Sequence, residues 1–272
     1  MIVLWRRIAS GAVLVPLLVG TVLHGKGWPF GLLTGAAALL CAREYFRMFF
    51  TSSRDRWSGM AVTVLAYLSG AMLPFPAAVS AVLLCVAMAA FHFLASEGAP
   101  GECFRLAATS ALGVVYVGGF LSAYPRTLSL PGGEHWVLLG ILAVAAGDTC
   151  AYFVGRAIGK RPLSPRFSPK KTVEGAVGGL VASVVCATGY AAVFLPGVPA
   201  WYALVAAAVL GLVGQAGDLF ESMLKRAAGV KDSGALLPGH GGLLDRADGI
   251  IAVGPVLHLI AVLSRQATGV SG

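Results

Sequence analysis

The sequence predicts an all-α integral membrane protein with about nine transmembrane helices, its N-terminus inside and its C-terminus outside. Three observations predict this class: the 272-residue chain is 57% hydrophobic, it is only 12% charged, and its mean hydropathy is +0.82. A soluble domain carries about 25% charged residues. So few charges cannot cover the surface of a soluble protein of this size, and the composition also excludes a disordered chain, a coiled coil and a disulfide scaffold.

The expected helices are continuous apolar runs, each close to the roughly 20 residues that cross a bilayer. The first five lie in residues 1–130, which form a predicted N-terminal transmembrane region. Residues 131–272 form a C-terminal transmembrane region that we expect to be catalytic, because the polar clusters described below lie there. The nine runs are 8–24, 29–46, 59–75, 77–95, 104–123, 135–154, 173–195, 199–218 and 247–264.

The basic residues predict the orientation. Cytoplasmic loops of membrane proteins are enriched in Lys and Arg. With the N-terminus inside, seventeen of the twenty basic residues fall on the inner side, and only Lys26, Arg126 and Arg265 fall outside. Because the bases lie between apolar runs rather than in one patch, the net charge of +8 does not indicate nucleic-acid binding. We therefore expect any chemistry to face the cytoplasm.

Two pairs of acids lie where the eighth and ninth spans meet this inner side. Asp218 and Glu221 are three residues apart, as are Asp245 and Asp248, so each pair shares one helix face. The intervening loop must return, which lets the pairs face each other. Clustered carboxylates repel unless a cation binds or one of them is protonated, and a hard cation such as Mg²⁺ suits them. The alternative is that Glu221 pairs with Lys225 and that Asp245 pairs with a neighbouring arginine.

Further polar residues accompany these acids. Asp148 lies inside the sixth span, where it predicts either a functional site or a buried hydrogen bond to another helix. Ser168 and Pro169 predict a helix start, with Ser as N-cap and Pro in the first position. Lysines beside such a start favour a phosphate, although topology and attraction to lipid headgroups also explain bases here. The bases concerned are Lys170, Lys171, Lys225, Arg226 and Lys231.

A glycine-rich turn, Pro238-Gly-His240-Gly-Gly242, separates the two acid pairs. Such a turn lets backbone N–H groups approach a phosphate. It matches neither the phosphate-binding loop of nucleotide hydrolases nor the dinucleotide-binding fingerprint. A histidine in such a turn has two equally plausible roles, and His240 is expected either to donate or accept a hydrogen bond or to take part in catalysis. Metal-binding acids, phosphate-binding bases and this turn together predict phosphate chemistry at the inner membrane surface.

The string that runs from Ser222-Met-Leu-Lys-Arg226 through Lys231-Asp-Ser-Gly234 and Pro238-Gly-His-Gly-Gly242 to Asp245-Arg-Ala-Asp248 closely resembles the signature of phosphatidate cytidylyltransferases, also called CDP-diacylglycerol synthases. Three more segments agree with the family: 147–160, 168–175 and 217–222. The N-terminal spans resemble it only in hydropathy.

The resemblance implies that CTP and phosphatidic acid react to give CDP-diacylglycerol and pyrophosphate, with Mg²⁺ required and a second cation such as K⁺ compatible. It implies Asp218, Asp245 and Asp248 as metal ligands. Asp148 and Glu221 are further candidates from their positions in the sequence. Lys225 and Arg226 would act beside these acids in catalysis. The residues expected to bind substrate phosphates are Ser168, Lys170, Lys171, Thr172, Lys231, His240, Gly241, Gly242 and Arg246.

The expected setting is the lipid bilayer of a bacterial inner (plasma) membrane. The glycine-rich Gly175-x3-Gly179 leaves homo-oligomerisation open, because small residues let helices approach closely. One alternative enzyme is a CDP-alcohol phosphotransferase, although Asp245-Arg-Ala-Asp248-Gly does not reproduce the motif of that family. The other alternative is a carrier for a phosphorylated solute or a cation. Against a carrier, the acids lie on one side only and no internal repeat is visible.

Overall fold

The computed structural model describes residues 16–23, 27–94, 98–236 and 241–267. These residues are mainly helical, with one short β-hairpin. They belong to two compact units: residues 1–126 with 228–246, and residues 127–227 with 247–272. Most of the first predicted span, 8–24, and the turn at 237–240 lie outside the described residues, although 16–23 are helical.

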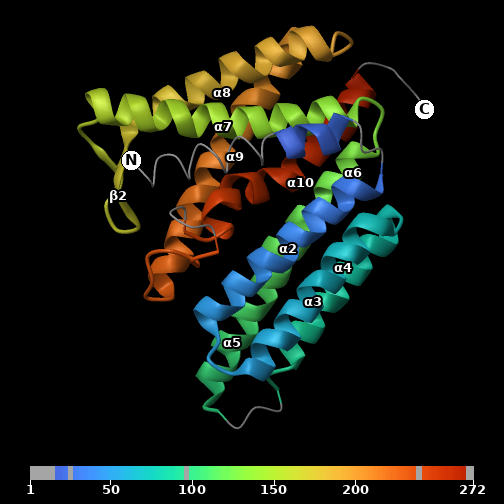
Figure 1. The fold of residues 1–272 in the computed structure, drawn as a ribbon, viewed down its shortest axis with the longest axis vertical. Coiled ribbons are helices and arrows are strands. Elements are labelled where there is room, and N and C mark those ends of the chain that lie inside the picture. The colour runs from blue at the N-terminus through green and yellow to red at the C-terminus, as the bar shows by residue number, and fades with distance from the viewer. Residues whose placement is uncertain (1–15, 24–26, 95–97, 237–240, 268–272) are drawn as a thin grey trace. The chain divides into compact units, whose positions relative to one another are not determined.

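The first unit contains a set of helices that lie alongside one another (Figure 1). Its small buried side chains allow close packing, and Ala66, Cys85, Ala89 and Val114 form one apolar cluster. A π-helical turn follows α5 directly. The elements that begin in this unit are α2 (Trp28–Phe49), α3 (Ser53–Met72), α4 (Phe75–Phe91), α5 (Pro100–Gly113), η1 (Val114–Gly119) and α6 (Ala123–Leu128).

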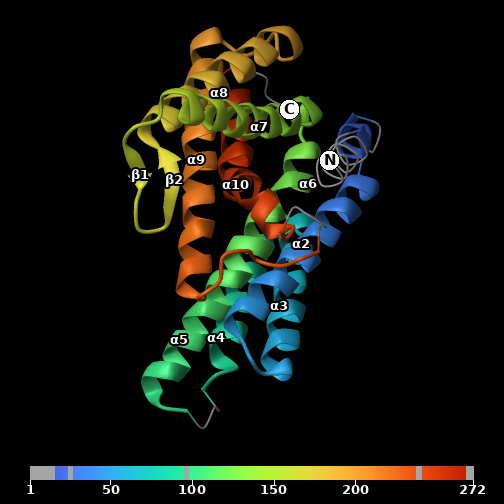
Figure 2. The same cartoon turned by 60° about the vertical axis from the view of Figure 1, so that its left-hand side comes forward.

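The second unit is built on two long helices that lie side by side, α7 (Gly133–Ile158) and α8 (Val173–Phe194) (Figures 1 and 2). Along the chain, α7 and α8 are joined by an antiparallel hairpin of strands β1 (Pro162–Ser164) and β2 (Ser168–Thr172). Helix α9 (Ala200–Ala227) packs against both long helices. Helix α10 (Leu244–Ala267) begins in the first unit and lies mostly in the second.

Glycines hold α7 and α8 close together. A Cβ at Gly175 would lie 2.7 Å from the carbonyl oxygen of Ala151, and a Cβ at Gly179 would lie 2.7 Å from that of Gly147. The Ser183 hydroxyl also donates to the carbonyl oxygen of Ala143 at 2.7 Å. The Gly175-x3-Gly179 face is thus used for helix packing within the chain.

Five helical segments among the described residues are long and apolar enough to cross a membrane. Each coincides with a predicted span, from the fifth to the ninth. The second to fourth predictions coincide with α2, α3 and α4, of which α4 is apolar but shorter. The chain is therefore a helical protein with membrane-spanning character. The five segments are Pro100–Leu128, Gly133–Ile158, Val173–Phe194, Ala200–Ala227 and Leu244–Arg265.

The predicted helix start at Ser168 and Pro169 is wrong. Both residues lie in β2, where Ser168 pairs with Ser164 across the hairpin. Helix α8 begins four residues later than predicted, because extended Thr172 is its N-cap and the Thr172 hydroxyl accepts the N–H of Gly175 at 3.1 Å. A hydroxyl that satisfies a free N–H of the first turn marks a helix start, and Thr172 does this instead of Ser168.

Candidate functional site

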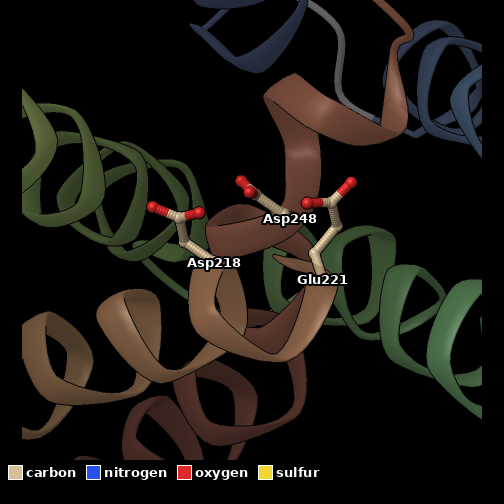
Figure 3. Close-up of side chains that lie close together, drawn as sticks. All are labelled: Asp218, Glu221 and Asp248. Carbon is tan, nitrogen blue, oxygen red and sulfur yellow. The ribbon is translucent and has the colours of Figure 1, made fainter. Parts of the chain in front are cut away.

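Three carboxylates meet in the second unit (Figure 3). Asp218 and Glu221 project from one face of α9, and Asp248 projects from α10. Ligand oxygens of all three lie within 4.8 Å of one another. Glu221 and Asp248 are buried, and Asp218 is half-buried. Three oxygen donors at this spacing form a candidate site for a hard divalent cation.

The acids meet because glycines let α9 and α10 approach closely. A Cβ on Gly217 would lie 2.9 Å from the carbonyl oxygen of Asp248. A Cβ on Gly249 would lie 3.0 Å from the Val144 side chain and 3.2 Å from the carbonyl oxygen of Gly214. Each of these glycines adjoins or faces a carboxylate of the group. Backbone contact at these positions therefore holds the acids together against the repulsion between their charges.

Two lysines partly offset the negative charge of the group. Lys171 of β2 forms an ion pair with Asp218. Lys225 Nζ lies 2.6 Å from Oε2 of Glu221, one helical turn away, which confirms the alternative pairing considered for Glu221. Three carboxylates against two ammonium groups leave one formal negative charge. The pairing of Glu221 and its place beside Asp218 and Asp248 therefore coexist.

Asp148 on α7 is a fourth acid near this group. Its charge interacts with those of Asp218, Asp248 and Lys171. It is exposed, unlike Glu221 and Asp248. The acid predicted inside the sixth span thus lies within electrostatic range of the acid group.

The hairpin that carries the other lysines is fastened to the same unit. Glu174 accepts the backbone N–H groups of Lys160 at 3.0 Å and of Arg161 at 3.2 Å. Arg226 Nε donates to the carbonyl oxygen of Phe167 at 3.3 Å, which joins the end of α9 to the hairpin. Lys170 is exposed on β2, next to Lys171. The hairpin therefore presents bases from a fixed position.

Asp245 makes a different set of contacts, with Gly242 and Ser233 of the first unit. Its Oδ2 accepts the N–H of Gly242 at 2.8 Å, the N–H of Ser233 at 3.0 Å and the hydroxyl of Ser233 at 3.0 Å. The Gly242 N–H, expected to approach a phosphate, thus donates to a carboxylate of its own segment. Gly241 has φ +80°, which favours glycine. Lys231 and Arg246 of this segment are exposed, and His240 lies outside the described residues.

One buried acid of this unit, Glu44 of α2, was not predicted from the sequence. Its carboxylate is buried and accepts hydrogen bonds from Ser233, Leu243 and Leu244. Glu44 is the only acid inside the predicted span 29–46. An acid within a span is a signal of function, and the same reasoning that selected Asp148 would have selected Glu44.

Comparison with known proteins gives a family for the chain. The model of the family described as "Cytidylyltransferase family" matches residues 5–264. Three similar curated proteins bear the name phosphatidate cytidylyltransferase. They come from Staphylococcus saprophyticus (42% identical over 160 residues, 58% of this chain and 60% of that protein), Bacillus subtilis (41% over 153 residues, 56% and 57%) and Staphylococcus aureus strain COL (41% over 162 residues, 59% and 61%). The chain thus matches about 60% of the length of these relatives.

Proposed function

We propose that this chain, which belongs to the cytidylyltransferase family, transfers the cytidylyl group of CTP to phosphatidic acid and releases pyrophosphate. The product is CDP-diacylglycerol. The observation that carries the proposal is the group of Asp218, Glu221 and Asp248 with its two lysine partners. Acids that suit a cation, beside bases that suit phosphates, fit a transfer between two phosphate-bearing substrates.

The reaction needs little proton transfer from the protein. The nucleophile is a phosphate oxygen of phosphatidic acid, and a phosphomonoester has its second pKa near 6, so it is already ionised at neutral pH. This oxygen forms a bond to the α-phosphorus of CTP while the bond from that phosphorus to the bridging oxygen breaks. The obstacle is the approach of two anions, so catalysis rests on positioning and charge.

Basic residues of the second unit supply positive charge for this reaction. Lys171 and Lys225 bring positive charge to the edge of the acid group, and Arg226 and Lys170 extend it along the hairpin. These bases stabilise the lipid phosphate and the leaving pyrophosphate. Asp218 orients Lys171 through their ion pair. Lys231, Arg246 and the segment around His240 are further candidates for phosphate contact.

Asp218, Glu221 and Asp248 would hold a divalent cation, which we propose to be Mg²⁺. The fit rests on the donor set: three carboxylates whose oxygens lie within 4.8 Å, two of them buried. When bound, the ion would supply positive charge to the CTP phosphates. Asp148 would add negative charge near this group. With four acids present, a second cation such as K⁺ is also compatible with the site. Asp245 stays a candidate ligand from the sequence, although its oxygens hold its own segment together.

We also propose the membrane arrangement expected from the sequence: nine spans, the N-terminus inside, the C-terminus outside and the site facing the cytoplasm at a bacterial plasma membrane. Seventeen of twenty bases on one side support this orientation. The acyl chains of phosphatidic acid would then remain in the bilayer while its phosphate reaches the site.

Pyrophosphate release from CTP by the purified full-length protein tests the proposal. With phosphatidic acid in mixed micelles and Mg²⁺, we expect release that depends on both substrates. Phosphatidic acid replaced by diacylglycerol is the control, because it lacks the attacking phosphate. A carrier or a CDP-alcohol phosphotransferase releases no pyrophosphate from CTP, so absence of release with both substrates contradicts the proposal.

A further inference from the structure

We propose that Glu44 is a positioning residue: its buried carboxylate holds residues 231–236 and 241–246 in the arrangement that the cytidylyl transfer requires. The inference rests on the function proposed above. Glu44 lies on α2, far from the recognisable motif in sequence; 189 to 200 positions separate it from the groups that it binds. It belongs to none of the segments that carry the resemblance.

The Glu44 carboxylate binds the segment at three points. Oε1 accepts the N–H of Leu243 at 3.0 Å, and Oε2 accepts the N–H of Leu244 at 2.8 Å and the hydroxyl of Ser233 at 3.1 Å. Only 6% of Glu44 is exposed. Leu244 is the first residue of α10, where free N–H groups and the helix dipole favour a negative charge. Glu44 thus caps α10 from another helix.

Ser233 links Glu44 to Asp245. Its hydroxyl lies 3.1 Å from Oε2 of Glu44 and 3.0 Å from Oδ2 of Asp245. A hydroxyl has one proton, so it donates to one of these carboxylates at a time. The backbone N–H of Ser233 also donates to Asp245 at 3.0 Å. A residue of α2 and a residue of the motif therefore share one serine, and a change at Glu44 reaches Asp245 through Ser233.

Two glycines of the motif fit around the Glu44 carboxylate. A Cβ on Gly234 would lie 2.7 Å from Oε1 of Glu44, and a Cβ on Gly242 would lie 2.7 Å from its Cδ. Real Cβ atoms do not approach other atoms this closely. These glycines are thus required by the approach of Glu44. Their place in the motif has a structural cause that involves no substrate.

The segment held in this way includes Asp245 and Arg246, and Asp248 follows on the next turn of the same helix. Small misplacements of groups that act on the reacting atoms are costly, because the transition state needs them aligned. Loss of Glu44 should therefore lower kcat more than it raises KM for CTP. A residue needed only for folding would instead lower the amount of active protein.

Glu44→Gln in the full-length protein is the test, since it keeps the shape of the side chain. An amide offers one acceptor oxygen, so at least one of the three donors loses its partner. We expect peptides covering 231–246 to exchange their amide hydrogens about tenfold faster, because hydrogen bonds to a charged group are lost. We expect kcat to fall at least about tenfold, with KM for CTP within about threefold. Glu102→Gln, on an exposed acid of α5, is the matched control and should change neither.

Two further variants keep the test valid if Glu44→Gln folds poorly. Gly234→Ala pushes a methyl group against Glu44 and should speed exchange in the same peptides, whereas Gly31→Ala, in open space on α2, should not. Ser233→Ala removes the shared hydroxyl but leaves both carboxylates with their backbone N–H donors, and it should also lower kcat.

Unchanged exchange in Glu44→Gln overturns the anchoring role, and faster exchange with unchanged kcat overturns the positioning role. Because hydrogen exchange is measured without substrate, it tests the role of Glu44 independently of the proposed cytidylyl transfer. An inactive wild-type protein contradicts the proposed function, and an unchanged exchange rate contradicts the role of Glu44.

Discussion

Removing the positive charge of Lys225 should destabilise the protein in a way that a divalent cation reverses. The Glu221 carboxylate is 0% exposed, and Lys225 Nζ lies 2.6 Å from its Oε2. Coulomb's law gives about 6 kcal/mol for that separation at an effective dielectric constant of about 20. Measured losses on removing one partner of a buried pair are about 3–5 kcal/mol. We expect Lys225→Met to lose about this much, because the carboxylate stays buried without its ammonium partner.

Thermal unfolding of the detergent-solubilised protein measures the effect. At roughly 2 °C or more per kcal/mol, Lys225→Met should lower Tm by about 6–10 °C. Excess Mg²⁺ should raise the Tm of Lys225→Met more than that of the wild type, because the ion replaces the charge lost beside Glu221. The matched control is Lys160→Met, on an exposed side chain, which should leave Tm nearly unchanged.

Two results would refute this reasoning. If Lys225→Met has the same Tm as the wild type, Lys225 does not stabilise the buried Glu221 carboxylate as the structure indicates. If Mg²⁺ raises both melting temperatures equally, Glu221 is not part of the cation site.

Four further outcomes follow from the same geometry. Asp248→Asn should lower pyrophosphate release about 100-fold or more while the protein stays folded by size-exclusion chromatography, and near-normal rates would remove it from the site. A chelator should abolish release and added Mg²⁺ should restore it; release that persists without divalent ions would argue against the cation. Gly217→Ala should cost about 1–3 kcal/mol in thermal unfolding because its Cβ would meet the Asp248 carbonyl oxygen, whereas Gly189→Ala, in open space, should not destabilise. Lys171→Ala should lower kcat about tenfold or more by leaving Asp218 without its ion-pair partner, and unchanged kcat would show that Lys171 only favours the topology.

Local sequence signals predicted much of the fold and two of the acids that lie together in the candidate site. The fifth to ninth apolar runs are helices of membrane-spanning character, because hydropathy over about 20 residues is a strong local signal. The three-residue spacing put Asp218 and Glu221 on one face of α9, where they lie together. Their meeting with Asp248 followed from the return of the loop between two helix ends.

Contacts that depend on tertiary structure were beyond such reasoning. Ser168 and Pro169 have the composition of a helix start, but pairing with β1 draws Ser168 into a strand and leaves the cap to Thr172. Asp245 has the same spacing as Asp218, yet its oxygens are taken by backbone and side-chain donors of its own segment. Glu44 is separated from its partners by most of the chain. No periodicity relates positions that far apart.

The most direct test of the proposed function follows the α-phosphate of CTP. The purified protein, given CTP labelled at that phosphate, phosphatidic acid and Mg²⁺, should move the label into the lipid extract and release unlabelled pyrophosphate in equal amount. The same label should stay in the aqueous phase with Asp248→Asn, whose side chain cannot replace the carboxylate. Label that stays in the aqueous phase with the wild-type protein, under every divalent cation tried, would contradict the proposed transfer.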